Sequence, residues 1–143
     1  DPNAKDPVDQ TSSRVQAVAC FFPPTDFLNY GEENRNALTF EMLKPFWGAF
    51  GAKSREKADL DEAARAASPI YSVSKETPPT LIIHGDADTL VPIQQSRLYM
   101  NRLESAGVPH RLVVREGKGH GWPSLGEDIS VLAQWIDEHC PAK

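Results

Sequence analysis

The chain has little or none of several features that would place it at once in a protein class. Its 143 residues hold only two cysteines, Cys20 and Cys140, which excludes a framework of disulfide bridges and leaves two unpaired thiols as the expectation. No apolar run approaches the roughly 18 residues of a membrane-spanning helix. Its 15 basic residues are outnumbered by 20 acidic ones and form no cluster that would line phosphates. We therefore expect no membrane span and no nucleic acid partner.

The first residues differ in character from the rest of the chain. Residues 1–13, within "DPNAKDPVDQTSSR", are polar and turn-rich and contain no apolar core typical of a signal peptide. We expect them to be a surface loop, or a leader left by truncation, and residues 14–143 to be a portion of one domain. The sequence assigns no localisation.

Three apolar segments predict the strands of a parallel sheet. "VQAVACFF" (15–22) and "TLIIH" (80–84) are nearly continuous apolar runs entered or followed by prolines, a pattern typical of strands covered on both faces. "HRLVVRE" (110–116) is more polar, which indicates a position nearer the sheet edge. A helix is expected between the second and third of these segments, because Pro92 suits the first helical position and Gly107 suits the C-terminal cap. Residues 80–143 therefore indicate an α/β class, a parallel sheet flanked by helices.

The last helix and the long connection between the first two strands also carry patterns. The final helix is expected to open with a capping box from Ser124 to Glu127, with an apolar face that comprises Ile129, Leu132, Ala133 and Ile136. Residues 24–79 predict a helical, aromatic insertion, with one helix in 34–51 broken at Pro45 and a second in 59–67 capped by Asp59. Its aromatic side chains line an acyl pocket in one interpretation. In the other, which we favour, they form a helix that covers the sheet.

Polar side chains follow two of the predicted strands where each strand ends. Asp86 and Asp88 come just after the second strand, and His120 comes just after the third, between glycines. Functional side chains gather at the carboxyl edge of a parallel sheet. A carboxylate there can accept the Nδ1 proton of an imidazole and stabilise the imidazolium that forms during proton transfer. Asp88 and His120 are therefore candidates for a catalytic acid and base.

These residues lie in two recognisable motifs. "HGDADTLVP" resembles the H-G-x-x-D-x-x-V-P segment of α/β-hydrolases related to prolyl oligopeptidases and small-ester (acetyl) esterases, and "GKGHGW" resembles their catalytic-histidine loop. The resemblance implies that Asp88 is the triad acid, that His120 is the general base and that Asp86 binds backbone amides in its turn. It also implies hydrolysis of a small ester, less readily of a peptide, with no cofactor. Residues 14–143 would then be the last three strands of an incomplete α/β-hydrolase fold.

The chain departs from that family in its nucleophile. The family order is Ser, Asp, His, with the serine in a G-x-S-x-G turn. None of the ten serines here has that setting; only Gly117 and Gly121 lie four apart, with Gly119 at the centre. In the family the strand that delivers the nucleophile pairs with the first strand of this chain, whose edge would otherwise recruit another chain. We expect the partner to be the missing N-terminal half, or a second copy in a homo-oligomer through the exposed first strand.

Three alternatives remain beside the serine-hydrolase interpretation. His84, Asp86, Asp88 and His120 make a conceivable set of metal ligands, but helical H-x-x-x-H spacing and a cysteine pair are lacking, so no metal is expected. "DADTL" resembles the D-x-D-x-T motif of Mg²⁺-dependent haloacid-dehalogenase-type phosphatases, with Asp86 as nucleophile and Asp88 as acid/base, although His84 and Gly85 separate it from its strand. The chain is also compatible with a non-catalytic interaction fragment.

Overall fold

The computed structural model describes residues 3–12 and 14–140, so the outer limits of the two predicted ranges (1–2, 13 and 141–143) lie outside it. The α-helices are α1 (Pro7–Gln10), α2 (Lys57–Ala67), α3 (Gln94–Ser105) and α4 (Ile129–His139). The strands are β1 (Val18–Phe21), β2 (Thr80–Gly85) and β3 (His110–Arg115). Short 3-10 helices are η1 (Ala37–Thr39), η2 (Glu41–Phe46), η3 (Pro69–Ser72) and η4 (Leu125–Asp128). Within the described ranges no helix has the length and apolarity needed to cross a membrane.

The three strands form one parallel sheet in the order β1-β2-β3, as predicted. All six residues of the central strand β2 are buried, because it has a neighbour on each side. The outer strand β3 is only partly buried, in agreement with its polar sequence. The four residues of β1 are also only partly buried. The apolar run of β1 predicts cover on both faces, yet its outer edge has no partner strand in the described chain.

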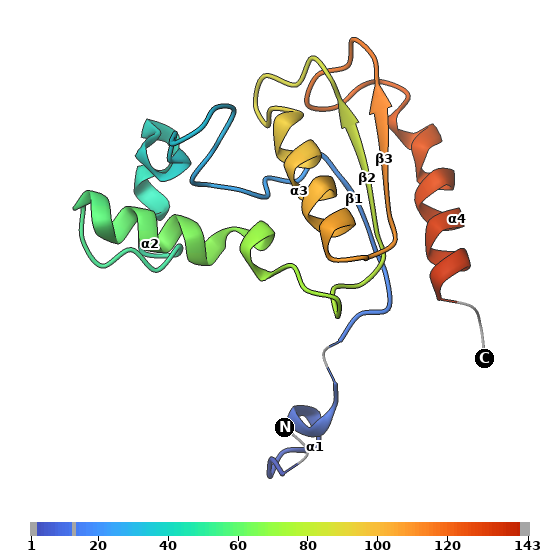
Figure 1. Ribbon diagram of the computed structural model, residues 1–143, viewed down its shortest axis with the longest axis horizontal. Coiled ribbons are helices and arrows are strands. Elements are labelled where there is room, and N and C mark those ends of the chain that lie inside the picture. The colour runs from blue at the N-terminus through green and yellow to red at the C-terminus, as the bar shows by residue number, and fades with distance from the viewer. Residues whose placement is uncertain (1–2, 13, 141–143) are drawn as a thin grey trace.

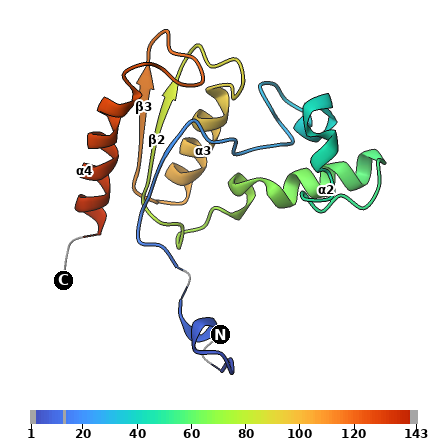
Figure 2. The same ribbon diagram turned by 180° about the vertical axis from the view of Figure 1, so that it is seen from behind.

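Helices α3 and α4 lie on opposite faces of the sheet (Figures 1 and 2). On the α3 side, Met100 and Leu103 pack with Ile82 of β2 into a buried core. Helix α3 begins at Gln94, two residues after the predicted start at Pro92. Its C-terminal end is closed, as predicted, by Gly107, whose φ of +70° lies in the left-handed region that suits glycine. The N–H of Gly107 donates to the carbonyl of Glu104 at 2.9 Å, and that of Val108 to Leu103 at 3.0 Å, which completes a Schellman cap.

The predicted start and face of the last helix are wrong. Residues 125–128 form η4 instead of an α-helical turn, and the side chain of Ser124 makes no capping bond. The buried residue of α4 is Trp135, whereas Ile129 and Ile136 are 57% and 36% exposed. Helix α4 contacts β1. The apolar face that the periodicity predicted for α4 is therefore largely exposed.

The insertion between β1 and β2 also differs from the prediction. Instead of an α-helix in 34–51 the chain forms η1 and η2, with Pro45 inside η2. Helix α2 begins at Lys57, so Asp59 lies within its first turn and is not the cap. The core of the insertion (Leu38, Leu60, Ala63 and Ala64, with partly buried aromatic neighbours) contains no residue of the sheet. The interpretation that we favoured, a helix that covers the sheet, is therefore wrong. The insertion projects beside α3 instead (Figure 1).

The first described residues stand apart from the sheet. Helix α1 is a single turn with Asp6 as its cap, the carboxylate accepting from Val8 N–H at 2.8 Å. It buries no residue, and Figures 1 and 2 both show it below the strands. Both cysteines are free thiols, as predicted.

Candidate functional site at the carboxyl edge of the sheet

The loops that follow β2 and β3 touch through their backbones. Ala87 N–H donates to the carbonyl of Lys118 at 2.9 Å. A Cβ on Gly85 would lie 2.2 Å from that same oxygen and 2.7 Å from the carbonyl oxygen of Gly119. Only glycine leaves room for this approach, because real Cβ atoms do not come so close to backbone. Gly85 therefore allows the two loops to share one edge.

Asp86 joins the same two loops from its exposed position. Its Oδ1 accepts a hydrogen bond from Gly117 N–H at 2.6 Å. Gly117 has a φ of +65° and Gly121 a φ of +107°, so two of the three glycines around the histidine adopt the unusual backbone angles that the sequence indicates. The position of Asp86 agrees with the backbone-binding role that the resemblance implies.

Asp88 and His120 lie in hydrogen-bond contact across a separation of 32 residues. The Nδ1–H of His120 donates to Asp88 Oδ2 at 2.8 Å. The other carboxylate oxygen, Oδ1, accepts from the backbone N–H groups of Leu90 and Val91, both at 2.9 Å. The Asp88 side chain is fully buried and that of His120 is 34% exposed. The carboxylate is thus held by three donors while the imidazole reaches the surface.

These contacts determine the charge of Asp88. Burial alone raises the pKa of a carboxyl, but the hydrogen bonds from Val91 N–H, His120 and Leu90 N–H outweigh it, and the pKa of Asp88 lies below its ordinary value. Asp88 is therefore an anion at neutral pH. Since an anionic carboxylate only accepts, the proton of the neutral His120 ring resides on Nδ1. Its Nε2 then carries a free lone pair, and no residue in the described ranges makes a hydrogen bond to that atom.

Phe22 is a neighbour of His120 that the sequence did not reveal. It follows β1, and its ring centroid lies 4.2 Å from that of His120. Its φ of +35° is unusual for a bulky side chain. Phe22 N–H donates to Ile83 O at 2.9 Å, so pairing with β2 holds this backbone. The only available signal is its position at a strand end, which the candidate catalytic residues share.

His84 lies beside the pair but has a different environment. Its side chain is fully buried. Nε2 donates to Val91 O at 2.8 Å, and Nδ1 accepts from the Ser96 hydroxyl at 2.6 Å, because a carbonyl oxygen cannot donate. Burial lowers the pKa of His84, against the opposing effects of the Val91 carbonyl and Asp88. His84 is therefore a neutral, hydrogen-bonded structural histidine.

The conceivable metal ligands do not gather into one site. In the part of the chain that the structure describes, no group of three or more His, Cys, Asp or Glu side chains is arranged to hold a metal ion. Asp86 is bonded to Gly117 and His84 to Val91 and Ser96. His84 Nε2 and His120 Nδ1 lie 3.4 Å and 2.8 Å from the same oxygen, Asp88 Oδ2, and Asp86 lies outside this group.

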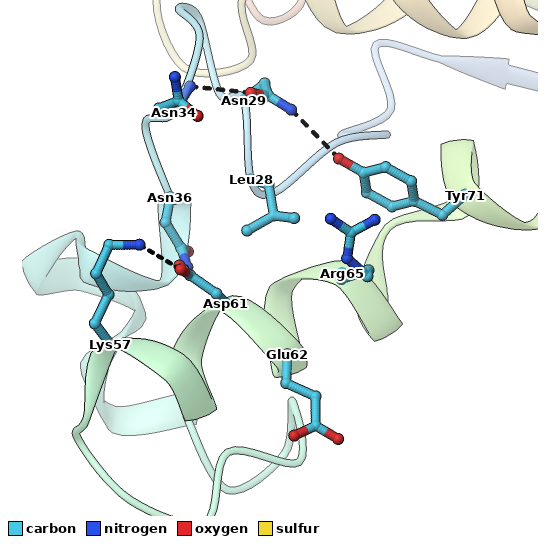
Figure 3. Close-up of a pocket in the computed structure, with 9 residues that line it drawn as sticks. All are labelled: Leu28, Asn29, Asn34, Asn36, Lys57, Asp61, Glu62, Arg65 and Tyr71. Carbon is cyan, nitrogen blue, oxygen red and sulfur yellow. Dashed lines mark hydrogen bonds and ion pairs between the residues drawn. The ribbon is translucent and has the colours of Figure 1, made fainter.

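A polar hollow of about 410 Å³ lies away from the pair, between the loop that contains Asn29 and helix α2 (Figure 3). Its polar side chains bond largely to one another: Asn36 Nδ2 donates to Asp61 Oδ1 at 2.8 Å, and Asn29 Nδ2 to the Tyr71 hydroxyl at 3.3 Å. Arg65 stacks on the ring of Tyr71 at 4.5 Å. None of the residues predicted for catalysis lines this hollow.

Comparison with known proteins identifies the fold and the family. The family model described as BD-FAE matches residues 2–103. Esterase LipQ of Mycobacterium tuberculosis is 36% identical over 107 residues, which are 75% of this chain and 24% of that protein. The probable carboxylic ester hydrolase LipM of the same organism is 28% identical over 103 residues, 72% of this chain and 22% of that protein. The chain thus spans about a quarter of these curated relatives.

Solved structures agree. A truncated carbohydrate esterase from gut microbiota superposes with a TM-score of 0.67 at 30% identity, over 87% of this chain and 44% of that one. Propionate-bound esterase Est2 of Thermogutta terrifontis superposes with a TM-score of 0.66 at 21% identity, over all of this chain and 50% of that one. The chain spans about half of each. It belongs to the BD-FAE family of esterase-like hydrolases, and its sheet is the last three strands of an incomplete α/β-hydrolase fold.

Proposed function

We propose that this chain supplies the acid and the base of a Ser-Asp-His triad in a carboxylesterase that acts on a small ester. The nucleophilic serine comes from outside the 143 residues. The observation that carries the proposal is the 2.8 Å contact between His120 Nδ1 and the buried Asp88 carboxylate, which leaves Nε2 unpaired at the surface of the described chain. Membership of an esterase-like family supports the reaction class.

Each residue would have a separate task. His120 Nε2 takes the proton of the serine hydroxyl as that oxygen attacks the ester carbonyl, and then gives it to the leaving alcohol. Asp88 keeps the other ring proton on Nδ1 and stabilises the imidazolium that forms in between. A water molecule, activated by the same Nε2, hydrolyses the acyl-enzyme. The lowered pKa of Asp88 keeps its negative charge in place throughout.

The phosphatase alternative has lost its support. That mechanism needs Asp86 and Asp88 free to face one phosphoryl group. Here Asp88 is buried and bonded to His120 and two backbone amides, while Asp86 is bonded to Gly117. A peptide substrate remains the less favoured possibility, since the similar proteins are named as esterases.

The test measures turnover of p-nitrophenyl acetate and covalent labelling by a fluorophosphonate. Both are applied to the 143-residue chain and to a longer protein in which the upstream coding segment precedes it. We expect neither signal from the chain alone and both from the longer protein. In the longer protein, Asp88→Ala and His120→Ala each lower kcat by at least about 10⁴-fold.

His110→Ala is the matched control, because His110 is the first residue of β3, at the opposite end of the sheet, and its Nδ1–H donates to the carbonyl of Val108 at 2.8 Å. It leaves turnover unchanged. If the folded longer protein is not labelled, or if Asp88→Ala retains wild-type turnover, the proposal fails. The first result would favour a non-catalytic interaction fragment.

A further inference from the structure

A second hollow, of about 260 Å³, lies on the other side of the loop that borders the polar one. Its wall is almost entirely hydrocarbon and includes Phe27, Tyr30, Phe40, Leu43, Phe50 and Leu90. The Phe27 and Phe50 rings lie 5.5 Å apart, and those of Tyr30 and Phe40 lie 5.7 Å apart. Aromatic side chains of the insertion therefore pack around this cavity, and the sheet does not contribute to it.

Two separate segments of the chain connect the cavity wall to the surroundings of the Asp88–His120 pair. Phe22, whose ring contacts that of His120, is followed two residues later by Pro24 in the cavity wall. Asp88 is followed two residues later by Leu90, also in the wall. Burial and then the charge of Asp88 raise the pKa of Tyr30, which is consistent with a position close to the carboxylate. The loop of Asp88 and the segment of Phe22, a neighbour of His120, thus each continue into the cavity wall.

The side chains of the wall have no free hydrogen-bond donor to offer a ligand. The Tyr30 hydroxyl donates to Leu90 O at 3.0 Å, so its hydrogen is already engaged, and this bond ties the insertion to the loop of Asp88. At the rim, Met42 and Leu90 are exposed apolar residues, 61% and 47% accessible. A polyhydroxylated group in this cavity would lose its water without replacement hydrogen bonds, which is costly. A hydrocarbon group would gain from the burial.

We propose that this cavity binds the apolar group of the ester, either an aryl ring or a hydrocarbon chain of several carbons. A cavity of roughly 150 Å³ already accepts benzene, so 260 Å³ has room for such a group. The inference rests on the proposed function, since it places the ester carbonyl at His120. It develops the interpretation in which the aromatic insertion lines an acyl pocket, and it adds that the bound group is apolar.

The test uses the active longer protein and two series of esters. In the first series the acyl group grows from acetyl to hexanoyl on p-nitrophenol; in the second the alcohol grows from ethyl to benzyl on acetate. The variant Leu43→Trp fills the cavity. We expect it to lower kcat/KM about tenfold or more for the larger members of one series and to leave the smallest members unchanged. The affected series identifies whether the acyl group or the alcohol binds in the cavity.

Phe46→Ala is the control, because Phe46 is 56% exposed in the same η2 segment and does not line the cavity. It changes neither series. If Leu43→Trp hydrolyses every ester as the wild type does, the cavity inference is overturned although the esterase function stands. Loss of p-nitrophenyl acetate turnover in the wild type would instead overturn the proposed function.

A binding measurement covers the case in which Leu43→Trp does not fold. Benzyl alcohol is added to the 143-residue chain with labelled methyl groups. We expect methyl resonances of Met42, Leu43 and Leu90 to shift, and glycerol at the same concentration to leave them unmoved. Shifts confined to other methyl groups, or equal shifts with glycerol, would contradict the proposal.

Discussion

At the scale of single residues, the imidazole of His120 is held from two sides. Asp88 accepts a hydrogen bond from its Nδ1–H at 2.8 Å, and the ring of Phe22 contacts it in a tilted arrangement, with 4.2 Å between centroids and 51° between planes. The sequence motifs predicted the first contact, because a strand-end aspartate and a strand-end histidine share one edge. They did not predict the second, because Phe22 and His120 are 98 positions apart and meet only through strand pairing.

Phe22 is therefore expected to act as a positioning residue. In the active longer protein, Phe22→Leu removes the ring that orients His120 and lowers kcat by about 10- to 100-fold, since small misplacements of a reacting group are costly. KM changes little, and Phe22→Tyr retains turnover because it keeps the ring. Phe21→Leu is the control: Phe21 contacts Phe22 and Trp122. Equal losses of kcat in both leucine variants would show a merely structural role.

The charge of Asp88 predicts a dependence of stability on pH. Because the pKa of Asp88 in the folded chain is below its ordinary value, the folded state binds this proton less readily than the unfolded state. The stabilisation is fully present above about pH 4, the ordinary value for aspartate, and is lost as the pH falls through the folded-state pKa. The pKa of Asp128, lowered by its bond to Arg115, contributes in the same direction.

Urea unfolding between pH 5 and pH 3 tests this dependence. As the pH is lowered, the free energy of unfolding decreases less steeply in Asp88→Asn than in the wild type. Asp137→Asn, at an exposed position on α4, serves as the control and keeps the wild-type slope. A slope unaltered by Asp88→Asn would mean that the carboxylate is not held as the contacts indicate.

At the scale of elements, the two loops after β2 and β3 act as one unit. The change Gly85→Ala places a Cβ 2.2 Å from Lys118 O and 2.6 Å from its carbonyl carbon. Backbone cannot move aside as a flexible side chain can, so the loops must separate. We expect a loss of about 1–3 kcal/mol in the free energy of unfolding, together with loss of esterase turnover in the longer protein.

The control for this change is Gly126→Ala in η4, where nothing lies within 4 Å of the added Cβ. Thermal melts and p-nitrophenyl acetate turnover of both variants give the comparison. A Gly85→Ala variant with wild-type stability and turnover would show that the loops do not approach so closely.

Local signals were sufficient for some elements and not for others. The C-terminal end of helix α3 was predicted because Gly107 marks it chemically, whereas the helix begins at Gln94, two residues after the predicted start at Pro92. The buried face of α4 was not, because Ile129, Ile136 and Trp135 are all apolar and only tertiary packing selects which of them is buried. The insertion forms 3-10 turns because Asn36 bonds Leu38 N–H at 2.8 Å and Pro45 interrupts the α-helical pattern.

At the scale of the whole molecule, β1 leaves one edge of the sheet unpaired in the described chain. Val18 N–H donates to the carbonyl of Pro79, just before β2, and Phe22 N–H donates to Ile83 within β2. The alternation along a strand therefore directs the N–H of Ala19 outward. An exposed row of such groups pairs readily with another chain. We expect the 143-residue chain to self-associate at micromolar concentration, or to associate with a segment that completes the sheet.

Sedimentation velocity of the wild type and of the variant Ala19→Pro tests this expectation. The variant removes an outward N–H donor and leaves the hydrogen bonds to β2 in place. The variant shifts the population towards monomer. A wild-type chain that is a monomer with a sharp thermal transition at the same concentration would contradict the prediction. Cys20→Pro provides the contrast, because the same alternation directs its N–H toward β2 and the change would weaken the sheet itself.

The sequence by itself determined the class of fold, the three strands and the pairing of Asp88 with His120. These follow from apolar runs, glycines and strand-end side chains, which are local patterns. Only the tertiary structure decided that Phe22 lies on His120, that Trp135 is the buried residue of α4, and that aromatic residues of the insertion enclose a cavity next to Leu90. Those contacts depend on which surfaces meet when distant segments pack, and no short stretch of sequence encodes that choice.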